Sequence, residues 1–207
     1  MNSLDFDVSK SSKADLRRIK KEEILSLPHE VRVKKDIQIG EWLKAYLEYY
    51  WKNSPSQKNQ SILNLGVYSP LKDEVVWDSA LVDLGFIKLC YPSYLSEGRM
   101  VFRQCSQEDL IYTRDFGVSI GAPSIDAIEE VPDICLIPGL CFTREGHRLG
   151  RGKGYYDRYL ENFSGVKIGI AYSEQFEAEL PCEEHDQLLD GVISEQGVLI
   201  AGELLSL

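Results

Sequence analysis

The stretch RLGRGKGYYDRYL, residues 148–160, combines residue types that suit the binding of an anion. Three glycines alternate with cationic neighbours, and an aromatic run of helical character follows directly. The glycines are Gly150, Gly152 and Gly154, and the cations are Arg148, Arg151 and Lys153. Glycine permits positive φ, and the N–H groups of such a loop can surround an anion beside a helix N-terminus. The pattern favours a nucleotide phosphate over the alternative, a plain surface turn.

The spacing of the glycines excludes two common nucleotide-binding motifs. The dinucleotide fingerprint GxGxxG would need a third glycine where Tyr155 stands. A P-loop would need glycine in place of His147, and serine or threonine in place of Gly154. Phosphate binding must therefore use some other arrangement of this loop.

A strand-like segment precedes the glycine loop and a helix follows it. DICLIPG, residues 133–139, is a short apolar run of the kind that is buried on both faces of a parallel sheet. In open α/β sheets, ligands bind beyond the carboxyl ends of the strands. We therefore expect the anion site at that edge of a sheet.

The rest of the chain alternates helical and strand-like segments. Helical patterns cover 11–27, with Ser11 or Ser12 as cap, 31–53, 73–85 and 154–163. Strand-like segments cover 61–69, 86–94, 99–105, 133–139, 166–173 and 191–200, the last as a strand or a hairpin around Gly197. Residues 115–124 have the composition of a loop. This order predicts an α/β fold: a mainly parallel sheet flanked by helices in Rossmann-like layers, preceded by N-terminal helices. We expect a flexible leader over residues 1–10 and one domain over residues 11–207.

Composition and charge restrict the partners. The 207 residues carry a net charge of −10 and a sequence pI near 4.9, which disfavours nucleic acid and anionic membranes. There is no signal-peptide pattern and no apolar run of the about 20 residues that cross a bilayer, so we expect a cytoplasmic protein. The five cysteines form no CxxC pair, which predicts reduced core thiols rather than a zinc site.

Four stretches carry a resemblance to one enzyme family. PGLCFTREGHRLGRGKGYYDRYL (138–160) is the most specific, and KADLR (13–17), YSPLKDEV (68–75) and LPCEEHDQLLDGVIS (180–194) match in the same order. Together they resemble the 5-formyltetrahydrofolate cyclo-ligase family. The resemblance implies a single α/β domain that converts 5-formyltetrahydrofolate to 5,10-methenyltetrahydrofolate with ATP and Mg²⁺, releasing ADP and phosphate. We expect a monomer whose partner is this small-molecule substrate.

The resemblance also implies roles for individual residues. The catalytic residues would be Arg148, Arg151 and Lys153. ATP would be bound by Lys13, Arg17, Arg148, Leu149, Gly150, Arg151, Gly152, Lys153, Gly154, Tyr155 and Tyr156. The folate would contact Glu74, Arg151, Lys153 and Tyr155. Mg²⁺, which prefers oxygen ligands, would be held by Asp157 and Asp186.

Five of these charged residues could instead have a purely structural role. Lys13 and Arg17 lie four residues apart, as on any solvated helix face. Glu74 would suit a helix N-terminus, Asp157 the first turn of a helix, and Asp186 a loop cap. The chain also departs from the family pattern at Ala122 where a glutamate is expected, at Trp77 where threonine is frequent, and at Thr143 within a usually Asp-containing turn.

Three other functions remain open at this point. A sugar-phosphate isomerase or a kinase-like enzyme could use a similar basic glycine loop, with a carboxylate base nearby. A non-catalytic relative that binds folate or nucleotide would accommodate the departures at Ala122 and Trp77. Nucleic-acid binding by the Arg/Gly loop is the least favoured, because the chain is strongly acidic.

Overall fold

The computed structural model of the chain describes residues 12–54, 62–78, 81, 84–115 and 117–207. The predicted leader over residues 1–10 lies outside the described residues. No helix within these ranges is long and apolar enough to cross a membrane.

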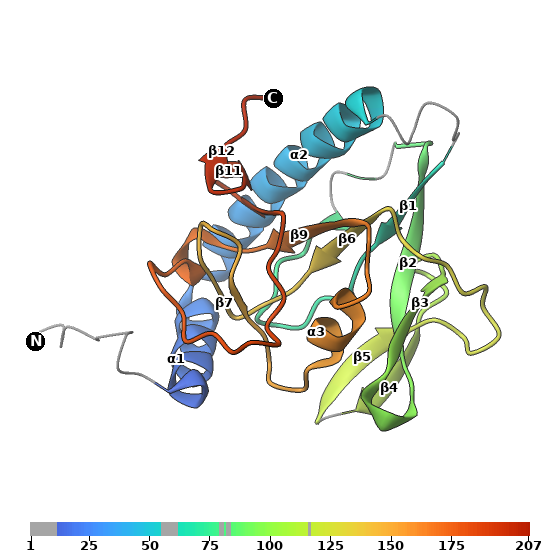
Figure 1. The fold of residues 1–207 in the computed structure, drawn as a ribbon, viewed down its shortest axis with the longest axis horizontal. Helices are drawn as coiled ribbons and strands as arrows, with labels where there is room; N and C mark the ends of the chain where they lie inside the picture. The colour runs from blue at the N-terminus through green and yellow to red at the C-terminus, as the bar shows by residue number, and fades with distance from the viewer. Residues whose placement is uncertain (1–11, 55–61, 79–80, 82–83, 116) are drawn as a thin grey trace, which may run out of the picture.

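An eight-stranded sheet forms the centre of the described structure, in the order β12-β11-β10-β9-β6-β1-β2-β3 (Figure 1). The parallel part consists of β1 (Leu63–Gly66), β2 (Ile87–Tyr94), β6 (Ile134–Ile137), β9 (Val166–Ile170) and β10 (Gly191–Ser194). The antiparallel edges are β3 (Met100–Gln104) on one side and β11 (Gly197–Ile200) with β12 (Glu203–Leu204) on the other. The predicted α/β fold with a mainly parallel sheet is confirmed, as is the hairpin around Gly197.

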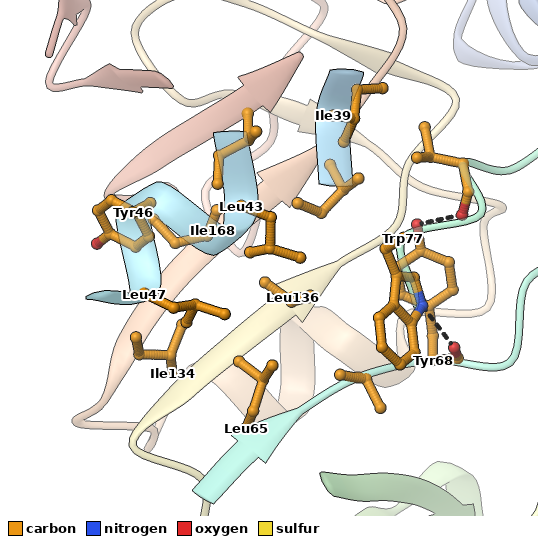
Figure 2. Packing of buried hydrophobic residues seen from close by; sticks show 14 of the residues in the cluster. Ile39, Leu43, Tyr46, Leu47, Leu65, Tyr68, Trp77, Ile134, Leu136 and Ile168 are labelled. Carbon is orange, nitrogen blue, oxygen red and sulfur yellow. Dashed lines mark hydrogen bonds between the residues drawn. The ribbon is translucent and has the colours of Figure 1, made fainter. Parts of the chain in front are cut away.

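Helices cover both faces of this sheet. α1 (Lys13–Ser26) and α2 (His29–Asn53) precede it, and α3 (Tyr155–Leu160) follows the glycine loop. Ile134 and Leu136 of β6 pack on the α2 side, as Figure 2 shows, whereas Cys135 and Ile137 pack on the α3 side. This alternation explains why the four residues of β6, ICLI, are all apolar: a strand buried on both faces needs apolar side chains at every position.

Local sequence sets the start and end of α1. The Ser12 side chain accepts the N–H of Asp15 at 3.2 Å and caps the helix. Pro28 follows the last turn and separates α1 from α2, because proline disfavours helical geometry in the residue before it. Both leading helices agree with the prediction.

Two predicted elements are wrong. Of the predicted helix over 73–85, residues 79–80 and 82–83 lie outside the described residues, and the remainder contains no α-helix. Val75 and Trp77 are buried while Val76 between them is exposed, an alternation that suits an extended segment over 75–77. Trp77 packs edge-on against Tyr68 and donates its Nε1–H to the Tyr68 carbonyl at 3.0 Å (Figure 2).

The second error concerns residues 115–124, which do not form a loop. β4 (Ile111–Asp115) and β5 (Val118–Ala122) make an antiparallel hairpin that pairs with no other described strand. Gly117 adopts φ +80° in the turn between them, a conformation that suits glycine. In Figure 1 this hairpin projects at the lower right.

The topology fixes where a ligand can bind. From β1 the chain proceeds to β2 on one side, and from β6 it proceeds to β9 on the other, so the strand order reverses between β1 and β6. In open α/β sheets a crevice forms beyond the carboxyl ends of the strands at such a switch point.

Candidate active site

A cavity of about 310 Å³ opens at this switch point. Its walls come from segments that are far apart in the sequence: the ends of β1, β2 and β6, the strand β5 and the glycine loop. The lining residues include Tyr68, Ser69, Pro92, Tyr94, Val118, Ile120, Pro138, Gly139 and 150–157. The glycine loop thus lies where the parallel sheet predicts an anion site.

The backbone of the glycine loop explains its composition. β7 (Cys141–Phe142) and β8 (Arg148–Leu149) form a short hairpin that leads into the loop. Gly152 and Gly154 then adopt φ of +85° and +67°, and Gly154 immediately precedes α3. Side chains rarely accept such φ values, so the turn into α3 depends on glycine at these positions.

Two predicted nucleotide-binding residues attach α1 to neighbouring segments, one of which is the glycine loop. Arg17 donates its Nε–H to the Gly150 carbonyl at 2.8 Å, and its guanidinium covers Gly152 closely enough that a Cβ there would lie 3.2 Å from Cζ. Lys13 Nζ lies 2.7 Å from the Asp186 carboxylate. The pair at i and i+4 therefore bridges α1 to two other segments rather than forming a solvated helix face.

Arg148 is the buried cation of the site. Its side chain is 4% exposed, and Nη2 lies 2.7 Å from Asp157 Oδ1. Its guanidinium stands 5.7 Å from the centre of the Tyr156 ring. Tyr156 itself is buried, and its hydroxyl has no hydrogen-bond partner among the described residues. Arg148 and Tyr156 thus form a polar but incompletely satisfied wall of the cavity.

Arg151 lies between two acids of the 71–77 segment. Its Nη2 is 2.9 Å from Asp73 Oδ1 and its Nε is 2.9 Å from Glu74 Oε1, while Glu74 Oε2 accepts the Leu71 N–H at 2.9 Å. Burial raises the pKa of the Glu74 carboxyl, and the charge of Arg151 offsets this only in part. Since Glu74 lies in a turn and no α-helix begins in the described residues 71–78, it does not serve the dipole of a helix there.

Lys153 and Tyr155 form the outer part of the loop. Lys153 is exposed and lines the cavity. Its carbonyl accepts an N–H of Arg158 at 2.9 Å, and Arg158 also donates to the Gly98 carbonyl at 2.9 Å. The Tyr155 ring meets Tyr94 edge-on with centroids 4.9 Å apart. These contacts join the glycine loop to the β2–β3 turn, which contains the 3₁₀ turn η4 (Ser96–Gly98).

The two predicted metal ligands lie in different surroundings. Asp157 lines the cavity beside Arg148. Asp186 is not among the described lining residues; it pairs with Lys13 and forms a group with Glu183 and His185 whose ligand atoms lie within 4.8 Å of one another. Burial would raise the pKa of Asp186, but Lys13 and the Glu183 N–H hold it below the usual range. Asp157 contacts Arg148 and Asp186 contacts Lys13. Both carboxylates have oxygens of the kind that Mg²⁺ prefers, but only Asp157 lies in the cavity wall that the described residues form.

The structure therefore brings most of the predicted site together. The predicted residues in the cavity wall are Glu74, Arg148, Gly150, Arg151, Gly152, Lys153, Gly154, Tyr155, Tyr156 and Asp157. Lys13, Arg17, Leu149 and Asp186 lie outside the wall that the described residues form, and Leu149 is buried against Leu16. Sequence reasoning missed Asp73, Tyr94, Arg158 and the β5 side chains. Of these, only Asp73 could have been found from the sequence, because it is an acid directly next to Glu74.

Comparison with known proteins identifies the family. A model of the 5-formyltetrahydrofolate cyclo-ligase family matches residues 89–195, which include β6, the glycine loop and α3. The chain belongs to this family. Among curated members, the chain is 27% identical to 5-formyltetrahydrofolate cyclo-ligase of Mus musculus over 203 residues, covering 89% of this chain and 94% of the mouse protein. It is 36% identical to the enzyme of Mycoplasma genitalium over 140 residues, covering 64% and 73% of the two chains.

Two solved structures of the family resemble this fold. A 5,10-methenyltetrahydrofolate synthetase from Mycoplasma pneumoniae superposes with a TM-score of 0.68 and 26% identity, covering 89% of this chain and 99% of that one. The synthetase of Aquifex aeolicus gives a TM-score of 0.71 and 26% identity, with 94% and 95% coverage. The resemblance noted in the four sequence stretches is therefore confirmed over nearly the whole fold.

Proposed function

We propose that this chain catalyses the ATP- and Mg²⁺-dependent cyclisation of 5-formyltetrahydrofolate to 5,10-methenyltetrahydrofolate, with release of ADP and phosphate. The observation that carries the proposal is the arrangement of one cavity at the switch point. It combines a basic glycine loop, suited to phosphate, with a buried carboxylate, Glu74, suited to the N–H donors of a pterin.

The chemistry explains why such a reaction needs ATP. The N5-formyl group is an amide, so its carbon is a poor electrophile and its oxygen a poor leaving group. Transfer of the γ-phosphoryl group to the formyl oxygen gives an iminium phosphate and ADP. N10 of the same folate then attacks the formyl carbon and loses its proton to solvent, and the C–O bond breaks as phosphate departs. Both nitrogens belong to one substrate, so the protein contributes by positioning and by stabilising charge.

Each charged residue then has a defined task. Lys153, Arg148 and Arg151 stabilise the phosphoryl group as its charge redistributes, and the N–H groups of 150–156 surround the phosphates. Lys13 and Arg17 hold the nucleotide from α1, and Tyr155 contacts the folate. Asp157 and Asp186 are the residues that would hold Mg²⁺, which when bound neutralises phosphate oxygens.

The positions of the departures favour an enzyme over a non-catalytic relative. Trp77 is fully buried in the core beside Tyr68. Thr143 is buried and accepts the N–H of His147 in the β7–β8 turn at 3.3 Å, and Ala122 pairs with Ile111 in the β4–β5 hairpin. None of the three is among the described residues that line the cavity. The substitutions therefore change the framework and not the cavity wall.

A direct assay tests the proposal. Purified protein is mixed with 5-formyltetrahydrofolate, ATP and Mg²⁺, and the near-ultraviolet absorbance of the methenyl product is followed beside controls without ATP or with EDTA. We expect an absorbance rise that needs both ATP and the metal. Absence of product from protein that still binds ATP would contradict the proposed reaction.

We further propose a single domain over residues 11–207, acting as a cytoplasmic monomer without membrane or nucleic-acid partners.

A further inference from the structure

Arg151 is paired with more negative charge than it carries. Asp73 and Glu74 each contact the guanidinium at 2.9 Å, and their side chains are only 6% and 7% exposed, against 32% for Arg151. Two carboxylates around one guanidinium leave a net negative charge when both are ionised. This arrangement opposes the approach of a phosphate to Arg151, although the same residue lines the cavity beside the glycine loop.

The two acids are not equivalent. Glu74 lines the cavity, and both of its oxygens are engaged, one by Arg151 and one by the Leu71 N–H. Asp73 is absent from the cavity wall as the described residues form it. Its Oδ1 contacts Arg151, whereas its Oδ2 is buried and has no hydrogen-bond partner in the described part of the chain. A buried, unpaired carboxylate oxygen is costly, so its retention needs a reason.

We propose that Asp73 is a positioning residue that retains Arg151 when the pterin of the substrate takes over Glu74. This inference rests on the proposed function. The N–H donors of the pterin compete with Arg151 Nε for the Glu74 carboxylate, since a ring N–H and an amino group match its two oxygens. Arg151 then loses one carboxylate neighbour but stays bound to Asp73 through Nη2. The Nε–H of Arg151, which no longer contacts Glu74, is then accepted by the Oδ2 atom of Asp73.

When the pterin replaces Arg151 at Glu74, the binding of folate strengthens the binding of ATP, and the reverse also holds. Before folate binds, Glu74 neutralises Arg151; afterwards, the guanidinium is held from one side and its remaining N–H groups are available to the phosphoryl group. Only arginine supports this arrangement, because its planar group bonds two acceptors at once along different edges. Because such coupling is reciprocal, folate tightens ATP binding by the same factor by which ATP tightens folate binding.

The experiment measures this coupling by calorimetry. AMP-PNP with Mg²⁺ is titrated into the full-length protein with and without saturating 5-formyltetrahydrofolate. In the unmodified protein we expect folate to tighten AMP-PNP binding by about tenfold, within the usual range for coupled sites. In Asp73→Asn we expect a coupling below about twofold, a fall in kcat of at least about tenfold and, because the coupling is reciprocal, a several-fold rise in KM for folate at saturating ATP.

A matched variant separates positioning from a general loosening of the segment. Asp36 on α2 also fastens the 71–77 segment, by accepting the Val76 N–H at 3.1 Å, and its hydrogen bonds run to Val76 and Tyr172 rather than to Arg151. Asp36→Asn should therefore keep the coupling. If Asp73→Asn does not fold, Arg151→Lys answers the same question, because one ammonium cannot replace the two-edged guanidinium; it should also lose the coupling.

The possible results distinguish the inference from the proposed function. Coupling retained in Asp73→Asn, or lost equally in Asp36→Asn, overturns the role of Asp73 while the activity assay still supports the function. Turnover without any coupling in the unmodified protein has the same effect. A protein that neither binds 5-formyltetrahydrofolate nor forms the methenyl product overturns both.

Discussion

The three cations of the glycine loop differ in how far the fold depends on them. Arg148 is buried and bonded to Asp157, and Arg151 is held by two acids, whereas Lys153 is exposed at the mouth of the loop. Removal of Arg148 or Arg151 would leave a carboxylate without its partner, which confuses a structural effect with a chemical one. We therefore choose Lys153, which is exposed, to test phosphoryl stabilisation.

Lys153→Ala should lower kcat by about 10²- to 10³-fold, as expected when one stabilising charge is removed from a transition state. The midpoint of thermal unfolding should change little, because Lys153 is exposed. The methenyl assay and a thermal melt check both statements. Lys52→Ala, at the exposed end of α2, is the control for loss of a surface charge. Near-normal turnover in Lys153→Ala would remove this residue from the catalytic set.

Glu74 predicts a pH dependence of substrate binding. Burial raises the pKa of this carboxyl, and only its ionised form accepts two hydrogen bonds from a pterin. KM for 5-formyltetrahydrofolate should therefore rise as the pH falls through this raised pKa. Initial rates across the mildly acidic range give the profile, and Glu74→Gln should show a uniformly high KM. A KM that stays constant with pH in the unmodified protein would argue against Glu74 as the pterin acceptor.

Ionisation of the Glu74 carboxyl, which should favour folate binding, disfavours folding. Its pKa in the folded state lies above that in the unfolded chain, so its ionisation opposes folding. The stabilising contribution of Glu74 is present at low pH and is lost as the pH rises through the folded-state pKa. Binding and stability thus favour different protonation states, as is frequent for functional residues.

At the scale of elements, α1 depends on a buried cation for its position. Lys20 lies on the same face as Leu16 and Ile24, and its ammonium bonds Glu177, Glu23 and the Glu174 carbonyl at 2.5, 3.0 and 2.9 Å. Burial alone would lower the pKa of Lys20, but these acidic partners raise it, so the side chain stays charged. The contacts attach α1 to the 3₁₀ turn η5 (Ser173–Gln175) and to the segment after it.

Lys20→Met should loosen α1 and so move Lys13 and Arg17 away from the loop. We expect a loss of about 3 kcal/mol in the free energy of unfolding, because a buried partner of Glu177 is removed. The KM for ATP should rise several-fold, and hydrogen exchange should accelerate in α1 more than in β6. Arg18→Met is the control, since the ion pairs of Arg18 with other described residues are exposed i,i+3 and i,i+4 pairs. Equal exchange in α1 of both variants would contradict this role of Lys20.

The elements that sequence predicts well are those whose signals are local. The apolar runs of β6 and β9 and the serine cap of α1 each lie within a few residues. The 73–85 segment was misjudged because Asp73 resembles a helix cap, while its carboxylate in fact serves Arg151, 78 residues later. Likewise, the glycines of 115–124 suggested a loop, although Gly117 is the turn of a hairpin whose first strand was not recognised. The contact of Arg158 with Gly98 has no sequence signal at all.

At the scale of the whole molecule, the two faces of the sheet have separate tasks. The α2 face contains the larger apolar core, and the α3 face lies next to the cavity. Leu43→Ala on α2 should therefore lower the free energy of unfolding by about 2–5 kcal/mol and leave kcat unchanged. Chemical denaturation and the methenyl assay test the two parts. Ile37→Ala, at an exposed position of the same helix, should change stability by less than about 0.5 kcal/mol.

The separate pairing of β4 and β5 has a consequence for how substrate range can evolve. Val118, Ile120 and Gly121 supply one wall of the cavity, yet the hairpin shares no ladder with the eight-stranded sheet. Substitutions on this hairpin should alter the shape of the cavity without disturbing the register of the strands that hold the glycine loop. We therefore expect substitutions at Val118 or Ile120 to change selectivity among reduced folates more than they change phosphoryl transfer.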